Sequence, residues 1–366
     1  MPTPPRGTST PASIEAYAQS DVGRTRDHNE DAYVVSDLGD GQSIAFDGAP
    51  LQLSARSGVL FMVADGMGGA AAGELASATA VEVVLRHLRE QWASQRAPDP
   101  GAFVESLEMA TETANGAIFR YAAEHPELRG MGTTATIAGL LGDTLYLAQV
   151  GDSRAYLVRD GVARQLTKDQ SLMQKLIEAG EISEEEAERN ERRNIILQAL
   201  GPEAAIKIDL THQRVRRDDV LILCSDGLSG LVRGDEIARV VVEEGDLARI
   251  CSRLVALANS LGGPDNITVV AARFTGEGFA SPREDDHVGH RVFDIPGREP
   301  SPTGTVDEML RVRSEQMEAL FQATPPELPP AILARRQEMS LVVRGVLAAA
   351  AVVLGGYMLW KLIQLF

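Results

Sequence analysis

Short apolar runs bounded by glycine, aspartate and asparagine recur along the first three quarters of the 366-residue chain. Most of these runs are continuous, without a polar residue at every second position. Such a pattern is typical of strands that are covered on both faces. The strands predicted in this way are Ala32 to Val35, Val59 to Ala64, Thr144 to Val150, Ala155 to Arg159, Val220 to Cys224 and Ile267 to Phe274.

Longer segments between these runs carry apolar residues at helical spacing. The predicted helices come in pairs between groups of strands, which differs from a regular alternation of strand and helix. This order favours a layered α+β domain with a largely antiparallel sheet system. The predicted helices are Gly73 to Ala93, Ala102 to Glu124, Ser171 to Ala179, Asp235 to Glu244 and Leu247 to Leu261.

Composition divides the chain into four regions. Residues 1–12 are rich in proline, threonine and serine and lack an apolar stretch, so a disordered tail is expected there and not a secretory signal. Residues 13–275 have the pattern of one folded domain. Residues 276–338 contain eight of the eighteen prolines and predict a flexible linker. Residues 339–366 are strongly apolar.

The apolar C-terminal region predicts a membrane anchor. Gly345 to Trp360 contains no charge but gives only about 24 Å of helix at about 1.5 Å per residue. Leu341 to Phe366 gives about 39 Å, enough to span a hydrocarbon core of about 30 Å with some tilt. Arg335, Arg336 and Arg344 precede the span and one lysine follows it, so we expect the folded domain to lie on the cytoplasmic side.

The charge balance limits the classes of partner. The chain has 52 acidic against 35 basic residues and a net charge of -17, which argues against nucleic acid as a main partner. Cys224 and Cys251 stand in no zinc-ligand spacing, and two reduced, buried thiols are the simple interpretation.

Four aspartates fall at the ends of predicted strands. Each alone is readily explained by a turn, because Asp-Gly is a common turn sequence. Together they place ionised carboxylates at the edge of a core, which is unfavourable unless a cation pairs with them. Magnesium and manganese prefer such oxygen ligands, and the adjacent glycines would let a backbone carbonyl approach the ion. The candidate ligands are Asp65, Asp152, Asp226 and Asp265, with Gly66 next to the first.

A polar segment near the start of the chain adds two candidates. Arg26 and Glu30 lie just before the strand at Ala32 to Val35. An arginine can hold a substrate phosphate through two parallel hydrogen bonds, and a carboxylate can bind a metal-bound water.

The order of these motifs resembles the metal-dependent protein phosphatases, the PPM or type 2C family. Six motifs occur in the family's order over about 250 residues of the sequence, which makes the resemblance specific. The motifs are Arg26-x-x-Asn-Glu-Asp31, Asp65-Gly-Met-Gly-Gly69, Gly132-Thr-Thr-Ala135, Gly151-Asp-Ser-Arg-Ala-Tyr156, Ser225-Asp-Gly-Leu228 and Asp265-Asn-Ile-Thr-Val269.

The resemblance implies a fold of two packed antiparallel sheets with helices outside. It implies that Asp65 bridges two Mn²⁺ or Mg²⁺ ions, with the Gly66 carbonyl on one of them. Asp226 and Asp265 would bind the other ion, and a weaker third ion is expected at Asp152 and Asp226. Arg26 would hold the phosphate, and Glu30 would hydrogen-bond a metal-bound water.

The implied activity is hydrolysis of phosphoserine and phosphothreonine in proteins, in opposition to serine/threonine kinases in bacterial signalling. Two alternatives stay open: a phosphatase-like protein that only binds phosphoproteins, and a phosphodiesterase that acts on small molecules. Animal members often have a histidine at the third position of the Asp65 motif, suggested to be the general acid. Met67 stands there in this chain and cannot act as an acid. His28 is a weaker candidate for that role, with solvent exposure as its simple interpretation.

Overall fold

The protein is a sandwich of two antiparallel sheets of six strands each, seen in a computed structural model that describes residues 12–39, 50–54, 58–92, 99–188, 190, 195–283 and 285–295. The first sheet has the order β3-β1-β12-β11-β8-β9. Its strands are β1 (Ser13–Asp21), β3 (Leu51–Ser54), β8 (Arg154–Arg159), β9 (Val162–Gln165), β11 (Val220–Cys224) and β12 (Ile267–Thr275).

The second sheet has the order β10-β7-β6-β4-β2, and the short strand β5 pairs with the end of β4. The sequential strands β6 and β7 form a hairpin. Strands β2 and β4 also pair directly, although β3, which lies between them in the sequence, belongs to the other sheet. The strands of this sheet are β2 (Asp31–Asp37), β4 (Val59–Met67), β5 (Gly132–Thr133), β6 (Ala135–Leu141), β7 (Thr144–Val150) and β10 (Asp209–Arg214).

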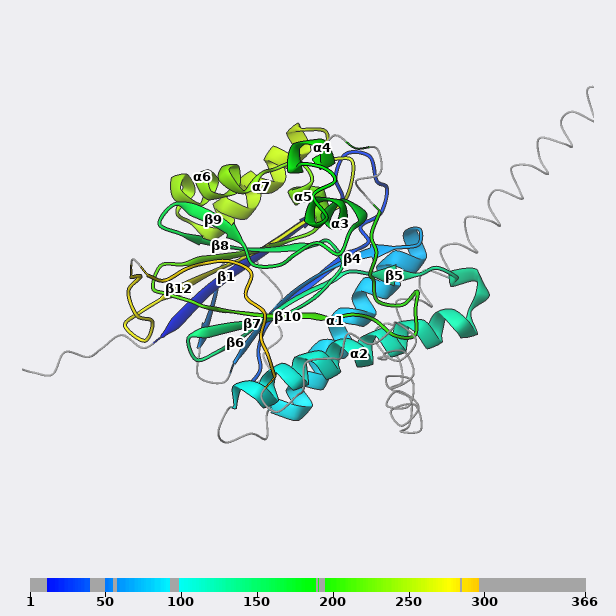
Figure 1. Cartoon of the computed structure of the whole chain (residues 1–366), viewed down its shortest axis with the longest axis horizontal. Helices are drawn as coiled ribbons and strands as arrows, with labels where there is room; N and C mark the ends of the chain where they lie inside the picture. Colours follow the sequence, from blue (N-terminus) through cyan, green and yellow to red (C-terminus); the bar gives the residue numbers. More distant parts are fainter. Residues whose placement is uncertain are drawn as a thin grey trace, which may run out of the picture. The chain divides into compact units, whose positions relative to one another are not determined.

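Helices cover the outer face of each sheet (Figure 1). Helices α1 (Ala70–Trp92) and α2 (Pro100–Glu124) pack on the second sheet, and α6 (Gly234–Glu244) and α7 (Leu247–Ser260) pack on the first. The predicted α-β-β-α sandwich is therefore confirmed. The shorter helices are η1 (Pro126–Leu128), α3 (Leu172–Glu178), α4 (Glu184–Glu188) and α5 (Asp226–Ser229).

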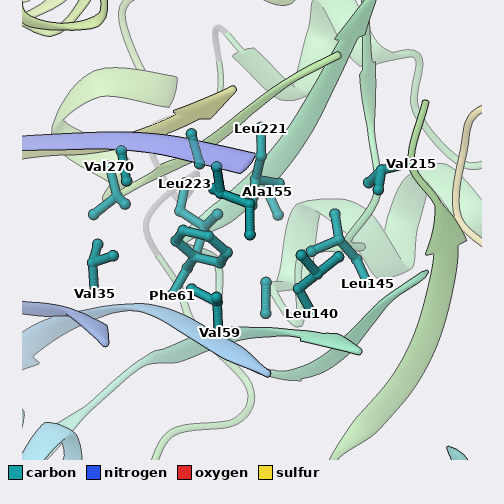
Figure 2. Packing of buried hydrophobic residues seen from close by; sticks show 14 of the residues in the cluster. Val35, Val59, Phe61, Leu140, Leu145, Ala155, Val215, Leu221, Leu223 and Val270 are labelled. Atoms are coloured by element: carbon teal, nitrogen blue, oxygen red, sulfur yellow. The ribbon is translucent and has the colours of Figure 1, made fainter. Parts of the chain in front are cut away.

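The continuous apolar runs are explained by burial on both faces of each strand. In β4, Val59 and Phe61 belong to the core between the sheets, where Phe61 lies against Leu223 of β11 (Figure 2). Leu60 and Met62 alternate with them and point to the opposite face, which α1 covers, and both are fully buried. A strand covered on both faces needs no polar positions, which is the pattern found in the sequence.

The folded domain extends beyond the predicted boundary at Thr275. Residues 276–295 were predicted to begin a flexible linker, but they pack back onto the sandwich. Phe279 is fully buried and stacks edge-on against Phe274 of β12, with ring centroids 5.5 Å apart. Val292 forms a β-bridge with Thr211, on the exposed edge of β10. The prediction of a linker was based on proline content, which does not reveal that the single side chain of Phe279 is buried against the domain.

Two predicted regions fall outside the described residues. They are the N-terminal tail, except for Ala12, and the apolar segment 339–366 together with the linker from residue 296 onward. Within the part of the chain that the structure describes, no helix has the length and apolar character needed to cross a membrane.

Candidate metal centre

The strand-end aspartates gather at one end of the sandwich. Asp65 lies near the end of β4, and its partner across the second sheet is Asp31 at the start of β2. In the first sheet Asp226 follows β11 and Asp265 precedes β12. These two strands are antiparallel neighbours. Asp152 lies between β7 and β8, and β8 starts opposite the end of β11. Strands from both sheets therefore bring these carboxylates to the same edge of the core.

These carboxylates lie within electrostatic reach of one another. Burial raises the pKa of Asp65 well above its ordinary value, and the charges of Asp31 and Asp226 raise it further. Asp152 and Asp265 act on Asp65 in the same direction. Burial is also the main cause of the raised pKa of Asp226, followed by the charge of Asp265. A cluster of this kind is unfavourable when ionised unless a cation neutralises it.

Asp152 is the most enclosed of the four predicted carboxylates. Its side chain is 7% exposed, and its Oδ1 atom is buried without a hydrogen-bond partner. Burial, then the charges of Asp226 and Asp169, raise the pKa of Asp152 to about 8. Arg154 lies two residues away but donates to both oxygens of Asp169. Asp152 therefore keeps an oxygen that a cation would satisfy.

Asp31 is a site residue whose role the sequence analysis missed. Its Oδ2 atom accepts from the hydroxyls of Ser225 at 2.8 Å and Thr268 at 2.6 Å, while its Oδ1 atom is buried without a partner. Burial raises the pKa of Asp31 to about 7 despite these two hydrogen bonds. The sequence contained an indication of this role, because Asp31 directly precedes the predicted strand at Ala32, and the predicted ligand Asp265 similarly lies two residues before a strand.

The Gly-Thr-Thr-Ala motif holds the backbone of Asp65. Thr133 Oγ1 and the Thr134 N–H both donate to the Asp65 carbonyl at 2.9 Å. The Asp65 N–H donates to Thr134 Oγ1 at 2.9 Å, and that hydroxyl also bonds Ser153 next to Asp152. The two threonines thus fix the position of Asp65 and join it to the loop between β7 and β8.

Arg26 and Glu30 reach the same centre from the loop before β2. The Arg26 guanidinium donates to Asp265 Oδ2 at 2.8 Å, and its side chain is 47% exposed. Glu30 is buried, and burial raises its pKa while the charge of Arg26 lowers it. His28 is exposed, in keeping with the simple interpretation of that residue.

Gly66 and Gly73 allow close packing beside Glu30. A Cβ atom on Gly66 would lie 2.2 Å from the Gly73 carbonyl oxygen, and one on Gly73 would lie 2.1 Å from Glu30 Oε2. The start of α1 therefore approaches the end of β4 more closely than any side chain would permit. The close approach brings the Glu30 carboxylate up to the Asp65 loop.

The donor set fits a hard divalent cation, because it consists of carboxylate oxygens with two buried oxygens left unpartnered. Among the described residues, no lysine or arginine forms an ion pair with Asp31, Asp65, Asp152 or Asp226. In the described part of the chain, no group of three or more His, Cys, Asp or Glu side chains has an arrangement that could hold a metal ion.

Comparisons with known proteins identify relatives of this chain. The family model described as Protein phosphatase 2C matches residues 27–257. The serine/threonine phosphatase stp of Listeria monocytogenes is 37% identical over 258 residues, which are 70% of this chain and 94% of that protein. The serine/threonine protein phosphatase PstP of Mycobacterium tuberculosis is 38% identical over 257 residues, 70% of this chain and 44% of that protein.

Solved structures give the same relationship. The crystal structure of the Mycobacterium tuberculosis phosphatase PstP/Ppp has a TM-score of 0.60 at 35% identity, covering 72% of this chain and 99% of that one. A structure of the PstP catalytic domain in complex with two manganese ions has a TM-score of 0.58 at 34% identity, with 72% and 99% coverage. With sequence, fold and carboxylate centre in agreement, this chain belongs to the protein phosphatase 2C family, the manganese- or magnesium-dependent serine/threonine phosphatases.

Proposed function

We propose that this phosphatase removes phosphate from phosphoserine and phosphothreonine in proteins at a two-ion centre built on the strand-end aspartates, and that it opposes serine/threonine kinases at a membrane. The observation that supports it most is the meeting of Asp65, Asp152, Asp226 and Asp265 at one edge of the core without an intervening lysine. When bound, manganese or magnesium supplies Lewis acidity and an activated water.

Each carboxylate has a place in this proposal. Asp65 would be a ligand of both ions, with the Gly66 carbonyl on one of them, and this role is supported by the charges of four other aspartates that act on it. Asp226 and Asp265 would hold the other ion. Asp152 would share a weaker third ion with Asp226, as its unpartnered Oδ1 atom suggests.

Arg26 and Glu30 would act on the substrate and the water. The Arg26 guanidinium lies at the exposed rim, so it can turn from Asp265 to a phosphate and offer two parallel N–H donors. Its positive charge would stabilise the negative charge on the phosphate oxygens. Glu30 is buried beside Arg26 and can accept a hydrogen bond from the attacking water.

A covalent phosphoenzyme has no candidate cysteine among the described residues. Cys224 and Cys251 are both fully buried. Burial raises the pKa of Cys224 to about 12 and raises that of Cys251 as well, so neither forms the thiolate that a nucleophile requires. These buried thiols support direct attack by water.

The membrane part of the proposal rests on the sequence alone. Residues 339–366 would span the bilayer once with the catalytic domain in the cytoplasm, and residues 296–338 would give that domain reach toward phosphorylated membrane proteins. Cell fractionation of the full chain beside a variant that ends at Glu338 tests this. Recovery of the full chain in the soluble fraction would contradict it, as would a shortened enzyme with altered peptide kinetics.

The catalytic proposal is tested by assaying the full chain with a phosphothreonine peptide and, in parallel, a cyclic nucleotide. We expect hydrolysis of the peptide only, dependent on added Mn²⁺ or Mg²⁺ and abolished by a chelator. Preference for the cyclic nucleotide would favour the phosphodiesterase alternative. Metal-dependent peptide binding without release of phosphate would favour a protein that only recognises phosphoproteins.

A further inference from the structure

The side chain of Asn266 is fully engaged with the loop that carries Arg26 and Glu30. Asn266 opens the approach to β12 directly after Asp265, and it is only 4% exposed. Its Oδ1 atom accepts from the Glu30 N–H at 2.8 Å. Its Nδ2 group donates to the carbonyl of Val22 at 2.9 Å and to that of His28 at 2.8 Å. The amide thus binds both ends of the 22–30 loop from 236 to 244 residues away in the chain.

This loop lies outside the named strands and helices. Between its two ends, residues 24–28 are exposed, so packing does little to hold them. Further bonds come from the Arg24 N–H to the Gly263 carbonyl at 2.7 Å and from Asn29 Nδ2 to Ser20 Oγ at 2.8 Å. Asn266 joins the two sides of the loop through one side chain, because it bonds Val22 before Arg26 and both His28 and Glu30 after it.

An asparagine amide suits this task because it offers two donors and an acceptor within one short side chain. Both N–H groups and the oxygen are already used inside the protein. The Asn266 backbone N–H also donates to Asp265 Oδ1 at 2.9 Å, which ties the loop's anchor to a predicted metal ligand. Loss of the amide would leave a buried N–H and two carbonyls without their partner.

We propose that Asn266 is a positioning residue that fixes the positions of Arg26 and Glu30 relative to Asp265. This inference rests on the proposed function for the roles of those two residues. Asn266 touches neither substrate nor metal in this scheme. It acts by holding the loop's backbone so that the guanidinium and the carboxylate face the reacting phosphate.

Asn115 of α2 provides a matched control. It is 1% exposed, and it makes the same three kinds of bond to a different loop. Its Oδ1 accepts from the Gly201 N–H at 2.8 Å, and its Nδ2 donates to the carbonyls of Glu203 and Ala204, each at 3.0 Å. Replacing either asparagine by alanine therefore removes one buried and two partly buried hydrogen bonds.

The test combines hydrogen exchange with kinetics on the full chain. In Asn266→Ala we expect faster exchange in peptides that span residues 22–30, with kcat/KM for a phosphothreonine peptide lowered about 10–100-fold, as for other outer partners of metal-site residues. In Asn115→Ala we expect faster exchange in peptides around residues 201–204, a similar fall in melting temperature, and kcat/KM close to wild type. If Asn266→Ala does not fold, Asn266→Ser replaces it.

A second measurement links Asn266 to Arg26. The KM increase in the double variant Arg26→Ala/Asn266→Ala should be smaller than the product of the two single increases, because both remove the same function. Equal kinetics in Asn266→Ala and Asn115→Ala would overturn the inference, as would unchanged exchange of residues 22–30 or independent effects in the double variant. Lack of phosphatase activity in the wild type would instead refute the proposed function. The hydrogen-exchange result would still test whether Asn266 holds the 22–30 loop.

Discussion

The two ends of the β-sandwich bury carboxylates in opposite ways. At the end of β11 that starts with Val220, Asp219 is 1% exposed and receives two hydrogen bonds from Arg159, at 2.6 and 2.8 Å. Nearby, Arg216 donates twice to Asp286, both at 2.6 Å. At the other end of the same strand five aspartates gather, and only Asp265 has an ion pair, with Arg26. In the described part of the chain none of Asp31, Asp65, Asp152 and Asp226 has an arginine or lysine ion pair.

The difference separates carboxylates that serve the fold from those that serve a cation. Hydrogen bonds from Arg216 lower the pKa of the partly buried Asp286 to about 2. At the buried Asp219 the hydrogen bond from Arg159 opposes the rise in pKa that burial causes. At Asp152 burial and the charge of Asp226 raise the pKa to about 8. A buried charge with an arginine fork has its counter-ion supplied by the chain itself. A buried charge without one needs its counter-ion from solution. The residue type is the same at both ends, so the partner decides the function.

The largest effect is expected from neutralising one carboxylate of the unpaired end. Asp226→Asn or Asp65→Asn should lower phosphopeptide turnover by several orders of magnitude, because a ligand shared by more than one ion is lost. The melting temperature without metal should stay the same or rise, since a buried uncompensated charge is removed. Steady-state kinetics at high Mn²⁺ and a chelator-treated melt measure both. Turnover near the wild-type rate would show that the aspartates of the unpaired end do not serve as metal ligands.

The reverse experiment removes the partner at the paired end. Arg159→Met leaves Asp219 buried without its cation and should destabilise the protein by about 3–5 kcal/mol, as broken buried ion pairs do. Denaturant unfolding measures this change, and the Mn²⁺ dependence of the folded fraction should not alter. The double variant Arg159→Met/Asp219→Leu should recover part of the loss. A destabilisation below about 1 kcal/mol would mean that this pair is equivalent to a surface salt bridge.

Arg26 pairs with Asp265 at the rim of the unpaired end, so its removal sharpens the comparison. Arg26→Ala should raise KM for a phosphopeptide about tenfold or more and lower kcat less, since a charged hydrogen bond contributes about 1.5–3 kcal/mol to binding. Arg24→Ala, the exposed neighbour two residues earlier, is the control and should change neither constant. An unchanged KM in Arg26→Ala would assign this arginine to the fold, as a partner of Asp265.

The smallest effect is a pH dependence at the paired end. The pKa of Asp286 in the folded protein, about 2, lies below its ordinary value of 3.8, so the unfolded chain binds the proton first as the pH falls. The Arg216 bond therefore stabilises fully above about pH 4, and this contribution disappears as the pH falls toward 2. The difference in melting temperature between wild type and Asp286→Asn should shrink over that range. A constant difference would show that residues 276–295 are held by Phe279 and not by this ion pair.

Much of the candidate site could be predicted because its signals are local. Asp65 and Asp226 each lie at the end of an apolar run and are followed by a glycine, and Asp265 lies two residues before the strand that starts at Ile267. Asp31 had a similar signal but was assigned no role, since its neighbours Arg26 and Glu30 offered more familiar chemistry. Asn266 lies within the last of the six motifs but was assigned no role, because hydrogen bonds to a loop more than 230 residues away leave no trace in local composition.

The sequence by itself predicted six of the twelve described strands, their burial on both faces and the presence of carboxylates at strand ends, because these follow from side-chain polarity along a short segment. Tertiary structure alone decided which carboxylates meet and which receive an arginine. The pairing of β1 with β12 joins Asp21 to Ile267, and it brings the 22–30 loop against Asp265 and Asn266. Charge interaction depends on distance and burial, and neither is defined until strands far apart in the chain lie side by side.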